Sequence, residues 1–206
     1  MIVIAVSDDA IDSVLERIVL PEGVILVHTS GTKSLVEFQN LIEIYSDVYV
    51  HAGVFYPLQT FTKGIEMDYK ELPFCIEAKN ELIENKLLQL AQSVSNQVSR
   101  MDSDERFILH VAAVFASNFT NYMLTVSHDL LEREQLNFDL LKPIIQSTIE
   151  KALFSNDPSL GQTGPARRGD WKTTGRHLEY LQETNEDWTE IYRLLTDKIR
   201  NLYISK

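Results

Sequence analysis

Short apolar runs alternate with stretches of helical spacing through the first half of the chain, and this alternation limits the fold more than any other feature. Residues 2–6 and 24–28 are continuous apolar runs bounded by turn or capping residues, as is typical of buried strands. Between them, Asp8 or Asp9 can cap a helix that Pro21 would end. We therefore expect a β-α-β unit with parallel strands joined by crossover helices.

The same alternation continues to Arg100 and then stops. Before Arg100 we expect a helix, two strands and a further helix, at residues 33–42, 48–55, 74–77 and 79–95. After it come helical patterns with hardly a strand signal, at residues 103–134, 139–154, 171–183 and 187–203. The predicted fold class is α/β plus all-α, with one domain over residues 1–100 and an all-helical domain over residues 101–206.

Charge and composition exclude several classes of partner. The chain carries 19 Lys and Arg against 30 Asp and Glu, a net charge of −11, which argues against binding to nucleic acid or to an anionic membrane surface. No run approaches the roughly 20 apolar residues of a membrane span, and the opening residues lead us to expect no signal peptide. The single cysteine, Cys75, lies in an apolar run and is expected in the core. A folded protein of the reducing cytoplasm is predicted.

Polar residues follow two of the expected strands. His28 ends the second strand and Thr29 and Ser30 come directly after it, and Gln59 and Thr60 follow the third. Ligands of open parallel sheets bind beyond the carboxyl ends of the strands, so these residues can face a ligand. They can equally cap the next helix or satisfy the backbone of a loop.

The helix expected from Ser103 carries its polar residues on one side. Residues 107–119 contain no formal charge, so we expect this helix to be buried nearly all round. At about 100° per residue, six of its uncharged polar residues fall within one arc of roughly 100°. They are His110, Ser117, Asn118, Asn121, Thr125 and His128. Buried polar groups need partners, which are either neighbouring helices or a ligand.

Within that arc, His110 and Asn118 are the strongest candidates for chemistry. Imidazole and amide groups can donate to a carbonyl or imine that gains negative charge as a hydride arrives. His128 lies further along, next to Asp129, and is expected at the rim. No HxxxH or HExxH spacing occurs in the chain, so no metal site is predicted.

A glycine-rich loop with two arginines lies near the C-terminal third of the chain. Gly161 to Asp170 contains Arg167 and Arg168, and arginine suits bidentate recognition of a carboxylate or phosphate. An arginine here can instead pair with Asp170 or a helix C-terminus to fix the loop. Only one of the two needs to face a ligand.

Five motifs in chain order resemble a known family. They are Val-Ser-Asp-Asp-Ala-Ile at 6–11, Val-His-Thr-Ser-Gly at 27–31, Phe-Tyr-Pro-Leu-Gln-Thr-Phe at 55–61, the segment at 109–121 and Gln-Thr-Gly-Pro-Ala-Arg-Arg-Gly-Asp at 162–170. Together they resemble the Rossmann-like oxidoreductases that carry the helical "domain of unknown function 2520". That family is similar to pyrroline-5-carboxylate reductase and to the 6-phosphogluconate dehydrogenase superfamily.

The resemblance implies a fold, an activity and a set of site residues. The fold would be the C-terminal part of a Rossmann-like parallel sheet followed by a helical, 6-phosphogluconate-dehydrogenase-like domain that commonly forms homodimers. The activity would be NADP-dependent hydride transfer to or from a small carbonyl, imine or alcohol. The residues implied near NADP(H) are Ser7, His28, Thr29 and Ser30. Those implied in catalysis are His110, Asn118 and Asn121, and those implied in substrate binding are Gln59, Thr60, Ser117 and Arg168.

The sequence departs from the family pattern at its start. Family members open with a strand and GxGxxG ahead of the Val-Ser-Asp-Asp motif, whereas Met1 falls inside the fourth strand of that pattern and the eight glycines never form GxGxxG. The expectation is a truncated or shortened member that binds NADP(H) weakly or not at all. The alternative is a non-catalytic module for dimerisation or ligand sensing, built on the same fold.

Overall fold

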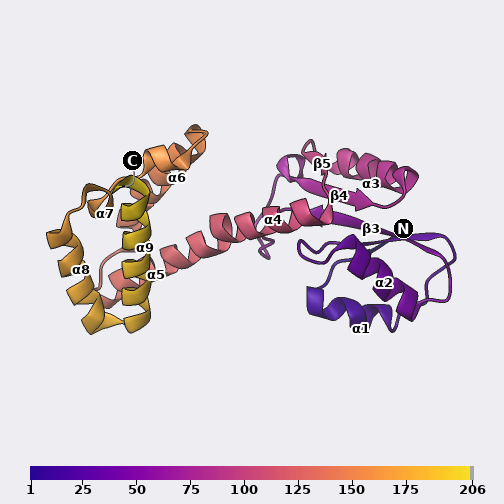
Figure 1. Cartoon of the computed structure of the whole chain (residues 1–206), viewed down its shortest axis with the longest axis horizontal. Helices are drawn as coiled ribbons and strands as arrows, with labels where there is room; N and C mark the ends of the chain where they lie inside the picture. The colour runs from indigo at the N-terminus through magenta and orange to yellow at the C-terminus, as the bar shows by residue number, and fades with distance from the viewer. Residues whose placement is uncertain (205–206) are drawn as a thin grey trace. The chain divides into compact units, whose positions relative to one another are not determined.

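A computed structural model describes the backbone of residues 1–204 and the side chains of residues 1–203. The chain forms two compact units, Met1–Asn121 and Tyr122–Lys206 (Figure 1). Composition shifts near Arg100, but the units divide within the long helix that follows. This is because the first turns of that helix pack against the sheet of the first unit.

The first unit contains a five-stranded sheet whose strands lie in chain order. The strands are β1 (Ile2–Ile4), β2 (Val24–His28), β3 (Val50–Pro57), β4 (Phe74–Ala78) and β5 (Val98–Arg100). Neighbouring strands are parallel except for β3 and β4, which are antiparallel, so the expected all-parallel topology is wrong at this pair. The described segment between them holds only the short 3₁₀ turn η2 (Tyr69–Glu71). Without a crossover helix, the chain reverses direction.

Helices cover both faces of this sheet. Helix α1 (Ile11–Leu15), which follows the turn η1 (Asp8–Ala10), and helix α2 (Leu35–Tyr45) pack on one face, and α3 (Glu81–Val94) packs on the other (Figure 1). Successive strand side chains point to opposite faces, so Leu26 packs with α1 and α2 while Val27 packs with α3. Cys75 is buried, as expected.

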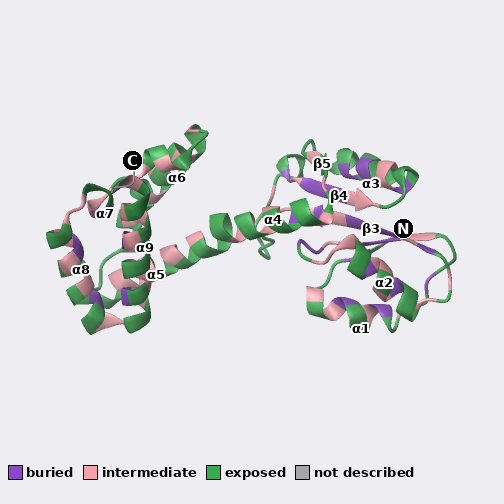
Figure 2. Cartoon of the chain, in the orientation of Figure 1, coloured by how far each residue is buried: buried purple, intermediate pink, exposed green. Residues whose placement is uncertain are grey.

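The long helix after the sheet is continuous from Ser103 to Arg133. It comprises α4 (Ser103–Ala113), a π-helical turn η3 (Val114–Phe119) and α5 (Thr120–Arg133). The expectation that it is buried nearly all round is wrong, since Phe107, Ile108, Phe115 and Phe119 are all exposed (Figure 2). Within this helix the single buried residue is Arg106, in the part of α4 that packs against the sheet. By length and composition alone this helix is able to cross a membrane, although the sequence pattern led us to expect no such segment.

The second unit is helical wherever it is described, as expected. After α5 come the turn η4 (Phe138–Leu141), α6 (Lys142–Phe154), the turn η5 (Pro158–Gly161), α7 (Pro165–Arg168), α8 (Trp171–Thr184) and α9 (Glu186–Ile204). Its buried hydroxyls are satisfied within their own helices: Thr174 bonds to the Asp170 carbonyl at 3.2 Å and Thr189 to the Asn185 carbonyl at 2.9 Å. Such bonds let polar side chains enter a small core.

Candidate functional site

A buried arginine fixes the first turns of α4 to the sheet. Arg106 is 0% exposed, and its guanidinium donates to the Glu77 carboxylate of β4 and, at 2.7 Å, to the Lys33 carbonyl. Ser103 donates to the same carboxylate at 2.8 Å and accepts from the Leu35 backbone at 3.0 Å. The α4 helix, the β4 strand and the start of α2 are thereby tied together, which sets the position of every residue further along α4.

One turn beyond Arg106, α4 closes a pocket at the carboxyl end of β3. The pocket has a volume of about 200 Å³. Its lining carries no formal charge and consists of Tyr56, Leu58, Gln59, Thr60, His110, Ala113, Val114, Ala116, Ser117 and Asn118. Of the predicted catalytic and substrate-binding residues, the structure brings Gln59, Thr60, His110, Ser117 and Asn118 together here.

His110 is held at this pocket by Tyr56. The Tyr56 hydroxyl lies 3.1 Å from His110 Nδ1, and burial raises the pKa of the Tyr56 phenol. The loop after β2 passes so close that a Cβ at Gly31 would lie 2.5 Å from His110 Nδ1 and 3.0 Å from Tyr56 Cζ. Gly31 is therefore required for the close approach of the loop to both rings.

The loop that follows β2 uses its polar side chains internally. Thr29 donates to the Ile4 carbonyl at 3.4 Å, and Ser30 donates to the Asp8 carboxylate at 2.8 Å. Thr32 donates to the same carboxylate at 2.6 Å. The hydroxyls of Thr29 and Ser30 thus shape the loop, and Ser7, at the start of η1, makes no side-chain cap.

His28 is sealed beneath this loop. Its side chain is 0% exposed, and Nδ1 accepts from the Ser30 backbone at 3.1 Å, which places the proton on Nε2. Burial, reinforced by the nearby Arg106 charge, lowers the pKa of His28 to about 3. The imidazole that was predicted to lie near a cofactor therefore has no accessible surface in the structure.

The π-helical turn η3 changes which residues of the long helix share a side. One extra residue in a helical turn rotates everything after it by roughly 100°, so an arc drawn with a constant helical period does not hold across η3. Ser117 and Asn118 lie within η3 and line the pocket, whereas Asn121 does not. Thr125 and His128 belong to the second unit.

The two arginines of the glycine-rich loop have different surroundings. Arg167 donates to the Gln162 carbonyl and lies over the Tyr203 ring, 4.8 Å from its centroid. Asp170 caps α8 by accepting from the Thr173 backbone at 3.1 Å. Arg168 is exposed and has no ion pair within the described residues. Of the two, Arg167 is therefore the one that fixes the loop, and a part for Arg168 in substrate binding stays a prediction.

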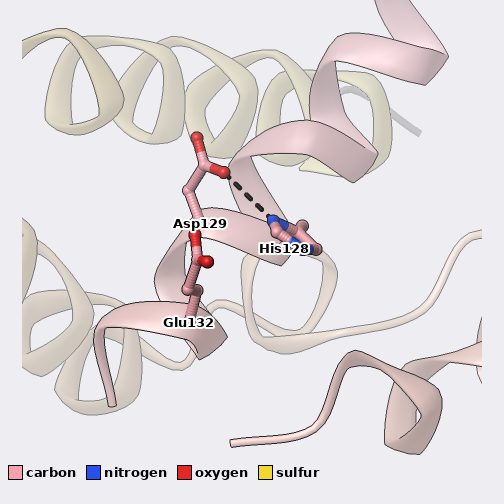
Figure 3. Close-up of side chains that lie close together, drawn as sticks. All are labelled: His128, Asp129 and Glu132. Carbon is pink, nitrogen blue, oxygen red and sulfur yellow. Dashed lines mark hydrogen bonds and ion pairs between the residues drawn. The ribbon is translucent and has the colours of Figure 1, made fainter. Parts of the chain in front are cut away.

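A second group of polar side chains lies on α5. His128, Asp129 and Glu132 place their ligand atoms within 4.8 Å of one another (Figure 3). A group of this kind can hold a divalent cation, although the sequence spacing had predicted no metal site. Local contacts also account for it: His128 Nδ1 lies 3.2 Å from an Asp129 oxygen, and its ring packs against Phe138.

A larger cavity of about 650 Å³ lies elsewhere, between α2 and the first turn of α4. Glu43, Lys79, Arg100 and Asp102 are among the residues that line it, and none of the predicted site residues does. Size therefore does not single out the pocket that contains the imidazole. What distinguishes this pocket is the grouping of polar side chains at the end of a strand.

Sequence reasoning missed three residues of this site. Tyr56 was seen only as part of a loop motif, and Arg106 and Glu77 were not singled out. A signal for Arg106 was present, because it is the last charged residue before the uncharged run 107–128 and lies four positions before His110. No local pattern indicates Glu77, since its partner lies 29 residues away.

The fold and the site together define a Rossmann-like α/β protein followed by a helical domain, the class in which ligands lie beyond the carboxyl ends of the strands. The model of the family called domain of unknown function DUF2520 matches residues 72–199. The chain belongs to this family.

Solved structures share the fold. BF3122 from Bacteroides fragilis, provisionally described as an NADP oxidoreductase, is 37% identical with a TM-score of 0.87 over 97% of this chain and 74% of that one. TM1727 from Thermotoga maritima is 23% identical, with a TM-score of 0.71 over 98% of this chain and 78% of that one. An imine reductase from Myxococcus stipitatus, solved with NADP+, is 15% identical with a TM-score of 0.57 over 99% of this chain and 73% of that one. No curated protein matches the sequence.

Proposed function

We propose that this chain is an NADP-dependent oxidoreductase that transfers a hydride to or from a small carbonyl, imine or alcohol. The observation that carries the proposal is the uncharged pocket in which His110, Ser117 and Asn118 face the segment Leu58–Thr60. The family and the 37% identity to BF3122 support the same class of activity.

The pocket residues have roles that follow from their chemistry. His110 and the Asn118 amide are donors that can stabilise negative charge on the reacting oxygen or nitrogen. Gln59 accepts from the Thr60 backbone at 2.8 Å through its carbonyl, so its NH₂ group is the end that can donate to a ligand. With no formal charge in the lining, the part of the substrate held here is uncharged. Arg168 is the proposed anchor for an acidic substrate group.

The residues present do not fit a whole dinucleotide. The sequence contains no GxGxxG, and the hydroxyls of Thr29, Ser30 and Thr32 are committed to Ile4 and Asp8. NADPH, when bound, would supply the hydride from its nicotinamide ring. In a GxGxxG motif the N-terminus of a helix binds the pyrophosphate. Because the sequence lacks this motif, we expect its affinity for NADPH to be weaker than low micromolar. A fluorescence titration measures this affinity directly.

Binding of a neutral probe tests the pocket itself. We expect cyclohexanone to perturb the amide NMR signals of Leu58–Thr60 and of residues 113–118, and we expect cyclohexylammonium and cyclohexanecarboxylate to leave them unchanged. His110→Ala should weaken cyclohexanone binding about fivefold, the loss expected for one hydrogen bond. His177→Ala, which removes an exposed histidine of the second unit, is the matched control. Equal binding of all three probes would contradict the proposed pocket.

A second copy of this chain is the proposed partner, through the long helix. Phe115 and Phe119 are exposed, and their rings stack edge to face at 4.9 Å. Adjacent exposed aromatic residues on one helix form the kind of apolar surface that an association buries. Because the net charge of −11 disfavours phosphate and anionic lipid, nucleic acid and membranes are not proposed partners. A cytoplasmic location is proposed because the single cysteine, Cys75, fits a reducing compartment.

A further inference from the structure

We infer that Tyr56 is a positioning residue, which fixes the tautomer of His110 so that Nε2–H faces the pocket as a donor to a neutral carbonyl oxygen or imine nitrogen. The inference rests on the proposed function, because it assigns His110 its part in that activity. It goes further by naming the residue that sets the direction of the hydrogen bond and the kind of atom that the pocket selects.

The first step concerns the direction of the hydrogen bond between the two rings. The Tyr56 side chain is buried, at 7% exposure for the residue, and its hydroxyl lies 3.1 Å from His110 Nδ1. Within the part of the chain that the structure describes, the hydroxyl has no other hydrogen-bond partner. If Nδ1 carried the proton, the phenolic hydrogen would be buried without an acceptor, at a cost of about 1 to 3 kcal/mol. The phenol therefore donates and Nδ1 accepts.

The second step concerns the opposite edge of the imidazole. A neutral ring with Nδ1 as acceptor carries its proton on Nε2. The Nδ1 and Cγ atoms face the loop after β2, since a Cβ on Gly31 would lie 2.5 and 2.8 Å from them. Nε2 is on the far side of the ring and makes no hydrogen bond within residues 1–203. Because His110 lines the pocket, Nε2–H is its free donor there.

The third step concerns the ligand atom that this donor accepts. A neutral carbonyl oxygen or imine nitrogen has a lone pair for Nε2–H, whereas a protonated iminium has none. The pocket lining also holds no carboxylate to balance an iminium charge. The pair of rings therefore selects the unprotonated form of the reacting group.

Burial keeps the phenol in its donating form. Burial raises the pKa of the Tyr56 hydroxyl, and the nearby Cys75 raises it further, while Arg106 opposes them. Asp8 also acts to raise it. The hydroxyl therefore keeps its proton at neutral pH and above.

Imidazole NMR of the ligand-free, full chain tests the inference. Long-range ¹H–¹⁵N correlation distinguishes the two tautomers of each histidine, and we expect His110 to carry its proton on Nε2. Tyr56→Phe keeps the ring and removes only the hydroxyl, so the protein should stay folded while His110 moves to a mixture of tautomers. A proton on Nδ1 in the unsubstituted protein, or a tautomer unchanged by Tyr56→Phe, would overturn the inference.

The second unit offers a matched control. His177 Nδ1 lies 2.7 Å from the Tyr192 hydroxyl, so the chain holds another pair of the same chemistry. Tyr192→Phe should change His177 alone, and Tyr56→Phe should change His110 alone. A change in both histidines for either variant would show a general structural effect and would count against a positioning role for Tyr56.

A further variant keeps the test independent of Tyr56 and of the proposed function. Gly31→Ala should displace the His110 ring from Tyr56 and produce the same tautomer mixture, and an unchanged tautomer there would contradict the geometry. No nucleotide is present in any of these measurements. If the tautomer behaves as expected but no hydride transfer is found, the proposed function fails and the positioning of His110 stands.

Discussion

At the scale of single residues, the candidate site depends on two histidines with opposite surroundings. His28 is sealed, with Nδ1 committed to the Ser30 backbone, whereas His110 is half-buried and lines a pocket. Both come from segments that the sequence singled out, but only one is accessible. The difference arises because side chains alternate across the sheet and because the loop after β2 folds back over its own strand.

Burial of His28 predicts a loss of stability in mild acid. Its pKa is about 3 in the folded protein and 6.5 when unfolded, so between these values only the unfolded chain binds the proton. The free energy of unfolding should therefore fall as pH drops below 6.5, by up to about 1.4 kcal/mol per pH unit from this residue. Urea unfolding at pH 6.5 and pH 5 measures the change.

The control for this prediction is a variant that keeps the acceptor without the titration. In His28→Asn the side-chain oxygen can still accept from the Ser30 backbone, and the pH dependence between pH 6.5 and 5 should flatten. His51→Asn should leave it unchanged. If the free energy of unfolding depended equally on pH in His28→Asn and in the unsubstituted protein, His28 would not be the group responsible.

Gly31 predicts a steric coupling with His110. A Cβ at this position would lie 2.5 Å from His110 Nδ1, so Gly31→Ala should lower the free energy of unfolding by about 1 to 3 kcal/mol. In a protein that already carries His110→Ala, Gly31→Ala should lower the free energy of unfolding by much less, because the imidazole ring is no longer there to clash. A double-mutant cycle by urea unfolding measures the coupling, and additive effects would contradict the close contact.

At the scale of elements, the position of α4 depends on a buried ion pair. Arg106→Met leaves the Glu77 carboxylate without its cation, which should lower the free energy of unfolding by about 3 to 5 kcal/mol. The double variant Arg106→Met with Glu77→Met removes both charges and should recover much of that loss. Urea unfolding of the single and double variants measures it.

The exposed pair formed by Arg100 and Glu84 is the comparison for that prediction. The Arg100 side chain is 58% exposed, so Arg100→Met should cost less than about 1 kcal/mol. If Arg106→Met cost no more than Arg100→Met, the ion pair would not be what anchors α4. A double variant that is less stable than Arg106→Met alone would contradict the same account of the anchor.

The elements show what the sequence could and could not predict. Most helices of the second unit and four of the five strands could be anticipated in type, because apolar spacing reports local structure well, whereas the short β5 was not expected. The antiparallel pairing of β3 with β4 could not be anticipated, because the direction of a strand depends on the connection before it and not on the residues of the strand itself. The π-helical turn η3 could not be anticipated either, and the arc drawn from the sequence does not hold across it: Ser117 and Asn118 line the pocket, whereas Asn121 does not.

At the scale of the whole molecule, exposed aromatic residues on the long helix predict self-association. Phe115 is 65% exposed, and Phe115→Glu should shift the sedimentation-equilibrium mass from dimer towards monomer. Val19 is 93% exposed and lies elsewhere, after α1, so Val19→Glu should leave the mass unchanged. A monomer in the unsubstituted protein, or dimers that survive Phe115→Glu, would contradict this interface.

The uncharged pocket lies within the first unit, which holds all of its lining residues. From sequence, the pocket was predicted through His110, Asn118 and Gln59, while Tyr56 was overlooked because a tyrosine in a β-strand is usual. What could not be predicted is the pairing across 54 residues that gives the imidazole its direction.

Transfer of deuterium from NADPH labelled at C4 to a small cyclic ketone or imine, detected by mass spectrometry, tests whether this chain exchanges a hydride. With the label on either face of the nicotinamide and with NADPH at high concentration, the unsubstituted protein should give deuterated alcohol or amine. His110→Ala should give at least about tenfold less. Absence of deuterium in the product from both labels, or equal incorporation by His110→Ala, would contradict an oxidoreductase site built around His110.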